Sequence, residues 1–396
     1  MRWYTCTPVA FGGGADFFAR DSGLLSRGFR EIGVESKAVM PGAPKPEDEE
    51  GLIRTDFTNL ESIEWWKSHE LDGVVLYAWG APRFRQVAKA IRKSGTFLVL
   101  NQDSSGAISP LCGISSWVNE QWVIHGGGTS LRSTAHSLAC ILKGATIGLL
   151  RTDPLRAKHL KQGNLIGALH PEAAANYRKL CRIYGGNALS DRVVILPHAV
   201  TSDLAFEETI PKQNNRIISI GRWDDTIQKR PGLLMETLGL LLSDDPDAKV
   251  DIVGRGSEVL ESWVSSLPPT QSARVKIHGK IPHEKIKDLL LAASIYYCPS
   301  SYESFNIAAA EALCSGCSVV SADLPTMASF RWFTGKASGS LAQSDDSQGH
   351  AGALIAELNH WRAGQRKAAE ISAHWAGFLH ADKVAKQVLA LTGQSR

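Results

Sequence analysis

Cysteine is scarce in this sequence, with seven residues among 396 at irregular spacings. So few scattered thiols cannot supply the disulfide framework of a small secreted protein, and we expect a protein of a reducing cytoplasm. No uninterrupted apolar run approaches the roughly eighteen residues that a membrane-spanning helix needs, and the amino terminus lacks the apolar segment of a signal peptide. We therefore expect neither standard export nor a spanning helix.

An excess of charge of one sign is also lacking, because 43 Lys and Arg residues face 40 Asp and Glu residues for a net charge of +3. This balance argues against nucleic acid as a partner, since an extended nucleic-acid footprint needs a marked basic excess. What is present is the ordinary globular composition of 43% apolar and 21% charged residues. At about 150 residues per domain, the length favours a two-domain enzyme over a small binding module.

Short apolar runs alternate with helical periodicity in the first half of the chain. Helices are predicted over 16–32 and 83–92, where apolar residues recur on one stripe. The runs predicted as strands are Trp3–Thr7, Val34–Val39, Gly73–Tyr77, Thr96–Leu100, Thr146–Leu150 and Val193–Leu196. This βαβ rhythm indicates a parallel sheet covered by helices.

The same rhythm restarts after the polar segment Pro211–Asn215. The predicted strands here are Ile217–Ile220, Val250–Val253, Val275–His278, Ile295–Cys298 and Ser318–Ser321. The predicted helices cover 229–242, 257–267, 283–292 and 305–315. We place a domain boundary near residue 205 and expect an α/β protein with two doubly wound, Rossmann-like domains facing a cleft, because open parallel sheets bind ligands at the carboxyl ends of their strands.

A glycine run, Gly12-Gly13-Gly14, follows the first predicted strand and precedes the first predicted helix. Glycine lets a backbone approach a ligand closely, and a following helix would offer its first amides to an anion. The run lacks the full dinucleotide fingerprint. Both a ligand loop and a plain tight turn therefore stay open.

Two cations flank the loop after the predicted strand Ile217–Ile220. Arg222 and Lys229 are seven residues apart and straddle the strand-to-helix loop. A guanidinium fork and an ammonium so placed can converge on one dianionic group. The alternative is a solvated basic loop.

The segment Ser300–Leu313 carries the most specific pattern in the chain. A strand ends near Pro299, the following loop carries Glu303, and an alanine-rich helix begins near Phe305. The first amides of that helix form an anion site, and Glu311 lies about 9 Å further along it at 1.5 Å per residue. Glu311 therefore suits a hydroxyl-bearing group beside the helix, although a solvated position is the alternative.

Taken in order, these pieces resemble the retaining nucleotide-sugar glycosyltransferases of family 4, which have the two-domain GT-B fold. The matching segments are Gly12–Gly14, Leu196–Val200, Gly221-Arg222 with Lys229, Ile252–Gly256, His278–Ile281, and Glu303 with Glu311. The resemblance spans the whole chain and is strongest from about 190 to 330.

The resemblance implies an acceptor-binding domain over 1–205, a nucleotide-sugar-binding domain over 206–375, and a final helix over 376–396 that crosses back to the first domain. The implied catalytic residues are Arg222, Lys229, Glu303 and Asp103. The implied donor-binding residues are Gly13, Gly14, Gly254, Arg255, Lys280, Ile281, Phe305, Asn306, Ile307 and Glu311. Arg222 and Lys229 would hold the diphosphate, Glu303 the sugar and Glu311 the ribose.

Three positions depart from the family pattern. The histidine that the family carries after a strand of the first domain has no evident match, and Asp103 is the nearest polar substitute. His198 stands where many relatives carry asparagine, and we interpret it first as a structural residue. Asn306 replaces a frequent glycine, so it either narrows the sugar site or serves as a polar lid.

The expected activity is transfer of a hexose from a nucleotide diphosphate sugar, such as UDP-glucose, to a hydroxyl of a saccharide or lipid-linked acceptor. We expect the configuration at the anomeric carbon to be retained, and we expect no metal or other cofactor. Such a reaction would serve polysaccharide or glycolipid synthesis. A donor-binding scaffold without turnover is one alternative, since the first-domain histidine is missing. A sugar-nucleotide epimerase or hydrolase on the same fold is another, although it would need an acid/base cluster that we do not find.

A basic amphipathic stretch, Arg83–Lys93, could rest on anionic lipid at the inner face of the membrane. A core-facing stripe with a solvated cationic back explains the same pattern. No zinc site is expected, because Cys314 and Cys317 have no second pair of ligands and the histidines lack the i,i+4 pairing of a zinc helix.

Overall fold

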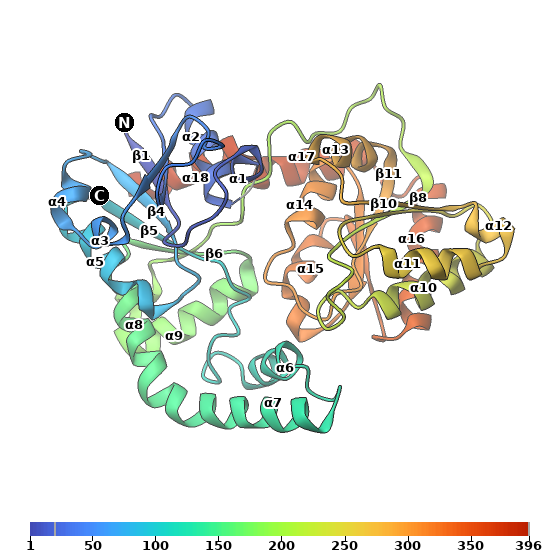
Figure 1. Ribbon diagram of the computed structural model, residues 1–396, viewed down its shortest axis with the longest axis horizontal. Helices are drawn as coiled ribbons and strands as arrows, with labels where there is room; N and C mark the ends of the chain where they lie inside the picture. Colours follow the sequence, from blue (N-terminus) through green and yellow to red (C-terminus); the bar gives the residue numbers. More distant parts are fainter. Residues whose placement is uncertain (20, 395–396) are drawn as a thin grey trace. The chain divides into compact units, whose positions relative to one another are not determined.

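The computed structural model describes residues 1–19 and 21–394 and divides into two compact units. The first unit contains residues 1–121, 135–202 and 378–396, and the second contains 122–134 and 203–377. Each unit has a parallel β-sheet of its own (Figure 1).

The sheet of the first unit has the strand order β3-β2-β1-β4-β5-β6-β7. Its strands are β1 (Trp3–Cys6), β2 (Ala38–Pro41), β3 (Leu52–Thr55), β4 (Gly73–Tyr77), β5 (Phe97–Gln102), β6 (Leu165–Ala168) and β7 (Val193–Ile195). The α-helices are α1 (Ala15–Phe18), α2 (Asp21–Glu31), α3 (Phe57–Leu60), α4 (Ile63–Lys67), α5 (Arg85–Lys93), α6 (Ile114–Ile124), α7 (Leu131–Lys143), α8 (Asp153–Leu160), α9 (Pro171–Ser190) and α18 (Ala381–Gln394). A 3-10 turn covers Pro82–Phe84, and a π-helical segment, Gly144–Thr152, joins α7 to α8.

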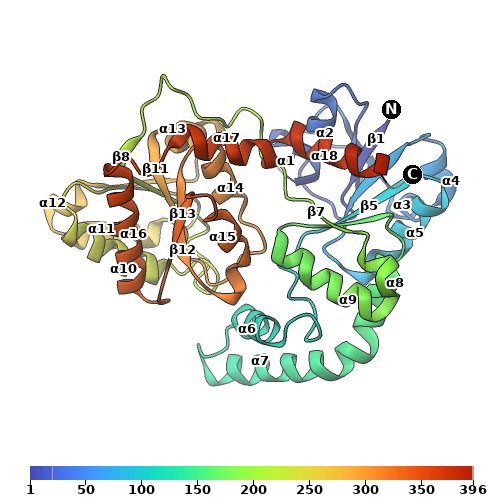
Figure 2. The same cartoon turned by 180° about the vertical axis from the view of Figure 1, so that it is seen from behind.

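Helices cover both faces of this sheet because its strands are apolar on both sides. Along β4, Val75 and Tyr77 pack with α2 and α18, whereas Val74 and Leu76 pack with α5, α8 and α9. Helices α2 and α18 lie side by side in both views (Figures 1 and 2). A Cβ at Gly28 of α2 would lie 2.3 Å from the carbonyl oxygen of Ala381 in α18, so glycine permits this close packing.

The sheet of the second unit has the order β10-β9-β8-β11-β12-β13. Its strands are β8 (Gln213–Ile220), β9 (Lys249–Val253), β10 (Val275–Gly279), β11 (Ala293–Tyr297), β12 (Ser318–Ala322) and β13 (Gly339–Ala342). The helices are α10 (Pro231–Asp244), α11 (Glu258–Ser266), α12 (Pro269–Ser272), α13 (His283–Ala292), α14 (Ile307–Cys314), α15 (Ala328–Phe333), α16 (Ser347–Arg362) and α17 (Ala368–Leu379), with a 3-10 turn at Pro325–Met327. Every strand predicted in this half is confirmed.

The strand predicted at Thr146–Leu150 is wrong, because these residues lie in the π-helical segment between α7 and α8. A short apolar run does not distinguish a strand from a helix, and here the flanking helices continue through it. The corresponding strand of the sheet is β6, which pairs with β5 and β7 and is buried along its whole length. The helix predicted over 16–32 is likewise two helices, α1 and α2.

Candidate functional site

The strand order of the second unit reverses between β8 and β11, because the chain adds β9 and β10 on one side of β8 and then returns to add β11, β12 and β13 on the other. Ligands of open parallel sheets bind at such a switch point, outside the carboxyl ends of the strands. The loop after β8 carries Arg222 and Lys229, and the loop after β11 carries Glu303. The fold therefore brings these three predicted residues to one edge of the sheet.

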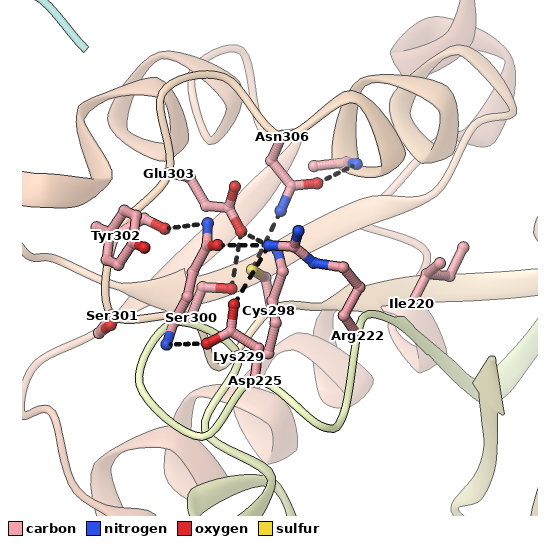
Figure 3. A network of polar contacts seen from close by, with 12 residues as sticks. Ile220, Arg222, Asp225, Lys229, Cys298, Ser300, Ser301, Tyr302, Glu303 and Asn306 are labelled. Carbon is pink, nitrogen blue, oxygen red and sulfur yellow. Dashed lines mark hydrogen bonds and ion pairs between the residues drawn. The ribbon is translucent and has the colours of Figure 1, made fainter. Parts of the chain in front are cut away.

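Lys229 and Glu303 form an ion pair between these two loops (Figure 3). Both side chains are largely buried, at 14% and 9% exposed, and the Ser300 hydroxyl also donates to Glu303 Oε1 at 2.8 Å. Burial is the largest single influence on the pKa of Lys229 and lowers it, but the charge and the hydrogen bond of Glu303, together with the nearby Cys298, outweigh burial and leave that pKa above its ordinary value. The Lys229 ammonium therefore carries a positive charge, which the carboxylate of Glu303 balances.

Arg222 lies beside this pair and is about half exposed. Its Nη2 donates to Gln228 Oε1 at 2.8 Å and to Asp225 Oδ2 at 3.3 Å. A hollow of about 380 Å³ opens here and is lined by Arg222, Asp224, Asp225, Thr226, Ile227 and Arg255. The guanidinium therefore faces a space open to a ligand, held by neighbours that orient it.

Helix α14 begins at Ile307, directly after the Glu303 loop. Asn306 is its N-cap: it has a left-handed backbone, with φ of 68°, and its Oδ1 accepts from the amide of Ala309 at 2.9 Å. Asn306 is therefore a capping residue, which explains a side chain where the family often has glycine. The Phe305 side chain is buried against Phe333, so only its backbone is available to a ligand.

Glu311 is nearly buried, and its Oε1 lies 2.8 Å from Nε2 of His283 at the start of α13. His283 was not predicted as a site residue, although it lies only two residues after Ile281, which was. Lys280 and Ile281 lie in the loop between β10 and α13, next to His283. The residues predicted around the ribose and the base therefore come from adjacent segments.

Gly254 and Arg255 follow β9. At Gly254 the backbone φ is 127°, and a Cβ there would lie 1.8 Å from the carbonyl oxygen of Gly221. The loop after β9 therefore comes so close to the loop after β8 that only glycine fits at this position. The carbonyl of Arg255 accepts from the amide of Trp223 at 2.9 Å, and its guanidinium lies 3.3 Å from Asp224. These contacts shape the loop that carries Arg222.

In the first unit, the glycine run follows β1 and is packed against the loop before β3. A Cβ at Gly13 would lie 2.0 Å from Asp48 Oδ1, and Arg54 donates to the Phe11 carbonyl at 2.9 Å. Helix α1 after Gly14 has only four residues and is followed by α2, so the run opens a short helix rather than the long one expected. Gly13 is closely packed, and a ligand at the glycine run stays a prediction.

Asp103 follows β5 and lies between two ring systems of the first unit. The indole of Trp79 donates to Asp103 Oδ2 at 2.8 Å, and His198 Nε2 lies 2.9 Å from Asp103 Oδ1. The His198 ring stacks on Tyr77 and is buried. The structure thus joins Asp103 to a histidine nearly a hundred residues away, which sequence spacing could not reveal.

The membrane contact predicted at Arg83–Lys93 is not supported. The apolar face of α5, including Val87 and Ile91, is buried in the core of the first unit together with Phe84, so it is not available to lipid. Among the described residues, no helix is long and apolar enough to cross a membrane.

One group of three possible metal ligands exists in the described part of the chain, namely His125, His136 and Cys140, whose ligand atoms lie within 4.8 Å of one another. His136 and Cys140 are four residues apart on α7, a spacing that pairs a histidine with a cysteine and not with a second histidine. None of the predicted donor residues belongs to this group. The absence of a metal from the reaction stays a prediction.

Comparison with known proteins locates the strongest similarity in the second unit. Residues 201–368 match the family "Glycosyl transferases group 1". A phosphatidyl-myo-inositol mannosyltransferase of Mycolicibacterium smegmatis is 28% identical over 185 residues, 45% of this chain and 46% of that protein. The protein of that name from Mycobacterium leprae is 27% identical over 187 residues, 46% and 48% of the two chains. This chain thus matches about half the length of these relatives.

Similarity of structure extends over the whole chain. The Anabaena protein Alr3699/HepE, solved in complex with UDP, has a TM-score of 0.65 at 13% identity and is covered completely, as is this chain. Sucrose-phosphate synthase from Thermosynechococcus elongatus has a TM-score of 0.60 at 15% identity, with 100% of this chain and 99% of that one covered. Residues 201–368 therefore form a domain of the glycosyl transferases group 1 family, and the chain has the GT-B fold of two Rossmann-like domains that its motifs predicted.

Proposed function

We propose that the protein is a retaining glycosyltransferase that moves a hexose from a UDP-linked donor, such as UDP-glucose, to a hydroxyl of a lipid-linked or saccharide acceptor. The observation that carries the proposal is the Lys229–Glu303 ion pair beside Arg222 at the switch point of the second sheet. Two cations at this edge suit a diphosphate, and a carboxylate beside them suits sugar hydroxyls.

In this proposal the cations stabilise the leaving group. The bond between C1 of the sugar and the diphosphate oxygen breaks, and the acceptor oxygen bonds to C1 on the same face. The acceptor proton passes to the departing phosphate oxygen, so the protein needs no nucleophile. Arg222, Lys229 and the backbone at the start of α14 would offset the charge that develops on the diphosphate.

Asp103 is the proposed acceptor-side residue of the first unit. Trp79 and His198 hold both of its oxygens, which fixes the carboxylate at the carboxyl end of β5. The buried side-chain amides of Asn101 and Gln102, next along the chain, have no hydrogen-bond partner among the described residues. Both amides are fully buried, so they belong to the interior beside Asp103 and are not exposed to an acceptor.

The relatives suggest which donors and acceptors to compare. The curated relatives are named for mannosyl transfer to phosphatidyl-myo-inositol, whereas structural neighbours were solved with UDP or with UDP-glucose. We favour UDP-glucose as donor and a lipid-linked hydroxyl as acceptor. GDP-mannose is included as a donor because it carries mannose, the sugar for which the curated relatives are named.

The test is incubation with UDP-glucose, UDP-galactose and GDP-mannose over a panel of lipid and saccharide acceptors, with mass spectrometry of the products and NMR of the new anomeric centre. Lys229→Met should abolish transfer, while Lys287→Met, a lysine of α13 paired with Glu207, serves as the matched control. An inverted product would refute retention, and transfer from GDP-mannose alone would refute the UDP donor. UDP binding without turnover would identify a scaffold, and donor interconversion an epimerase.

A further inference from the structure

Arg230 directly follows Lys229, and its backbone is left-handed, with φ of 49°. A side chain makes this conformation unfavourable, whereas glycine adopts it freely. A backbone of this kind persists only where the surrounding contacts hold it in place. The side chain of Arg230, which is only 18% exposed, makes such contacts.

The guanidinium of Arg230 joins three loops at the carboxyl ends of the strands of the second sheet. Its Nε donates to the carbonyl of Pro299 at 2.6 Å and its Nη2 to that of Ser300 at 3.3 Å, both in the loop after β11. Nη1 and Nη2 also donate to the two carboxylate oxygens of Asp345, at 2.8 and 2.7 Å, in the loop after β13. Arg230 itself ends the loop after β8, so it connects segments 69 and 115 residues away in the chain.

Asp345 is also held from its other side. Its Oδ1 lies 3.3 Å from Nε2 of His350, a fully buried residue of α16. Nδ1 of the same ring lies 3.0 Å from the hydroxyl of Tyr297, at the end of β11. Burial raises the pKa of Asp345, but the hydrogen bonds and charges of His350 and Arg230 outweigh burial and leave that pKa below its ordinary value. Asp345 therefore carries a negative charge that balances the charge of Arg230.

The contacts of Arg230 close a ring with the proposed donor residues. The carbonyl of Ser300 accepts from Arg230, and the hydroxyl of the same serine donates to Glu303 Oε1 at 2.8 Å. Glu303 pairs in turn with Lys229, which precedes Arg230 in the chain (Figure 3). The position of the Lys229 ammonium is therefore linked, through Ser300 and Glu303, to the side chain of Arg230.

We propose that Arg230 is a positioning residue of the donor site and that it acts through Lys229. By fixing the loops after β8, β11 and β13 to one another, it keeps the Lys229 ammonium where a diphosphate can bind. Its own charge is balanced by Asp345, so it is not a further cation for the ligand. The amide of Ser301 joins the first two loops before Lys229, at the carbonyl of Gln228, and Arg230 joins them after it. This inference rests on the proposed function.

The experiment is calorimetric titration of UDP and of inorganic pyrophosphate into the full chain and its variants. Arg230→Gly suits the left-handed backbone and removes only the side chain. Loss of a charge-assisted contact with Lys229 would weaken an anion roughly ten- to 150-fold, so Arg230→Gly, which loosens that contact, should weaken both ligands about tenfold. Arg230→Lys should not restore binding, because one ammonium cannot reach both partner loops as the planar guanidinium does.

Two comparisons distinguish positioning from direct contact between Arg230 and the phosphates. Asp345→Asn removes a negative charge and releases Arg230, which would strengthen binding if Arg230 were a phosphate ligand. We expect weaker binding instead, because the loops lose their connection. In a Lys229→Met background, Arg230→Gly should cause no further loss of affinity, since residues that act through one another are not additive.

The matched control is Arg362→Ala, which breaks another Arg–Asp pair of the same unit, with Asp245 at 2.6 Å. Asp245 precedes β9 and lies at the opposite edge of the sheet from the donor loops, so this variant should lose stability and keep its affinity. Without ligand, hydrogen exchange over 221–230 and 299–306 should be faster in Arg230→Gly and unchanged in the control. Thermal melts verify that each variant is folded.

The outcomes separate this inference from the proposed function. Wild-type affinity in Arg230→Gly, rescue by Arg230→Lys, or tighter binding by Asp345→Asn would each overturn the positioning role. Full additivity with Lys229→Met would show that Arg230 acts independently of Lys229 and would also overturn it. A wild type that binds neither UDP nor pyrophosphate would overturn the donor site itself, and with it both proposals.

Discussion

Breaking the Lys229–Glu303 ion pair should change both the stability of the protein and its affinity for UDP, and the direction of the change in affinity depends on where the diphosphate binds. Glu303→Gln keeps the size of the side chain and an oxygen for the Ser300 hydroxyl, but it leaves Lys229 without its carboxylate. Removing one partner of a fully buried pair costs about 3–5 kcal/mol, and the slight exposure of both side chains reduces this to about 2–3 kcal/mol. The unliganded variant should therefore unfold at a lower temperature.

The same substitution should tighten UDP binding. If the diphosphate lies beside Lys229, the Glu303 carboxylate repels it in the wild type; two unit charges about 6 Å apart interact by roughly 3 kcal/mol at an effective dielectric constant of 20. Solvent at the open hollow reduces this to about 1–2 kcal/mol, which corresponds to roughly five- to 30-fold higher affinity. Turnover should fall, because the sugar loses its carboxylate partner.

Calorimetric titration of UDP and thermal melts with and without UDP measure both effects. The control is Glu357→Gln, which breaks another buried ion pair of the same unit, with Arg366 at 2.6 Å, outside the proposed donor site. The control should lose stability and keep its UDP affinity. Unchanged or weaker UDP binding by Glu303→Gln would show that the diphosphate does not lie beside Lys229.

Four further outcomes are expected. Glu311→Ala should weaken UDP binding by roughly ten- to 150-fold, from charge-assisted hydrogen bonds of about 1.5–3 kcal/mol, and unchanged affinity would remove the ribose from this carboxylate. Asp103→Asn should lower transfer yet leave UDP titrations unchanged, since UDP is proposed to bind the other unit. Transfer should persist in EDTA, and a loss that Mg²⁺ restores would contradict metal independence. Burial raises the pKa of Glu120 to about 7 despite the hydrogen bond from Ser105, so folding stability should fall as the pH rises from about 4.5 to 7. In urea melts, Glu120→Gln should be about 2 kcal/mol more stable than the wild type at pH 8 and no more stable than the wild type at pH 4.

Local periodicity was enough to predict most of the strands and some of the helices. Alternating strand and helix patterns depend on residues a few positions apart, so β8 to β12 and α13 could be located from the sequence. The motif order likewise predicted the fold and the glycosyltransferase family. The prediction was wrong at Thr146–Leu150, where an apolar run is exposed on a helical segment while β6 takes the place in the sheet.

The pairing of charges could not be predicted, because it depends on which strands become neighbours. Lys229 and Glu303 are 74 residues apart and meet only because β8 and β11 flank the switch point of the second sheet. The sequence supplied Asp103 and His198 as two separate departures from the family pattern, and the structure joins them.

Which apolar faces are buried also depends on contacts between segments that are distant in the sequence. The basic pattern of α5 and the leucines of α7 both indicate amphipathic helices, but the sheet of the first unit buries the apolar face of α5 and leaves that of α7 exposed. The amino-acid sequence by itself determined the local elements, the motifs and the chemistry of each side chain. Only the tertiary structure decided which side chains lose water and which charges become partners, because both depend on contacts between segments far apart in the chain.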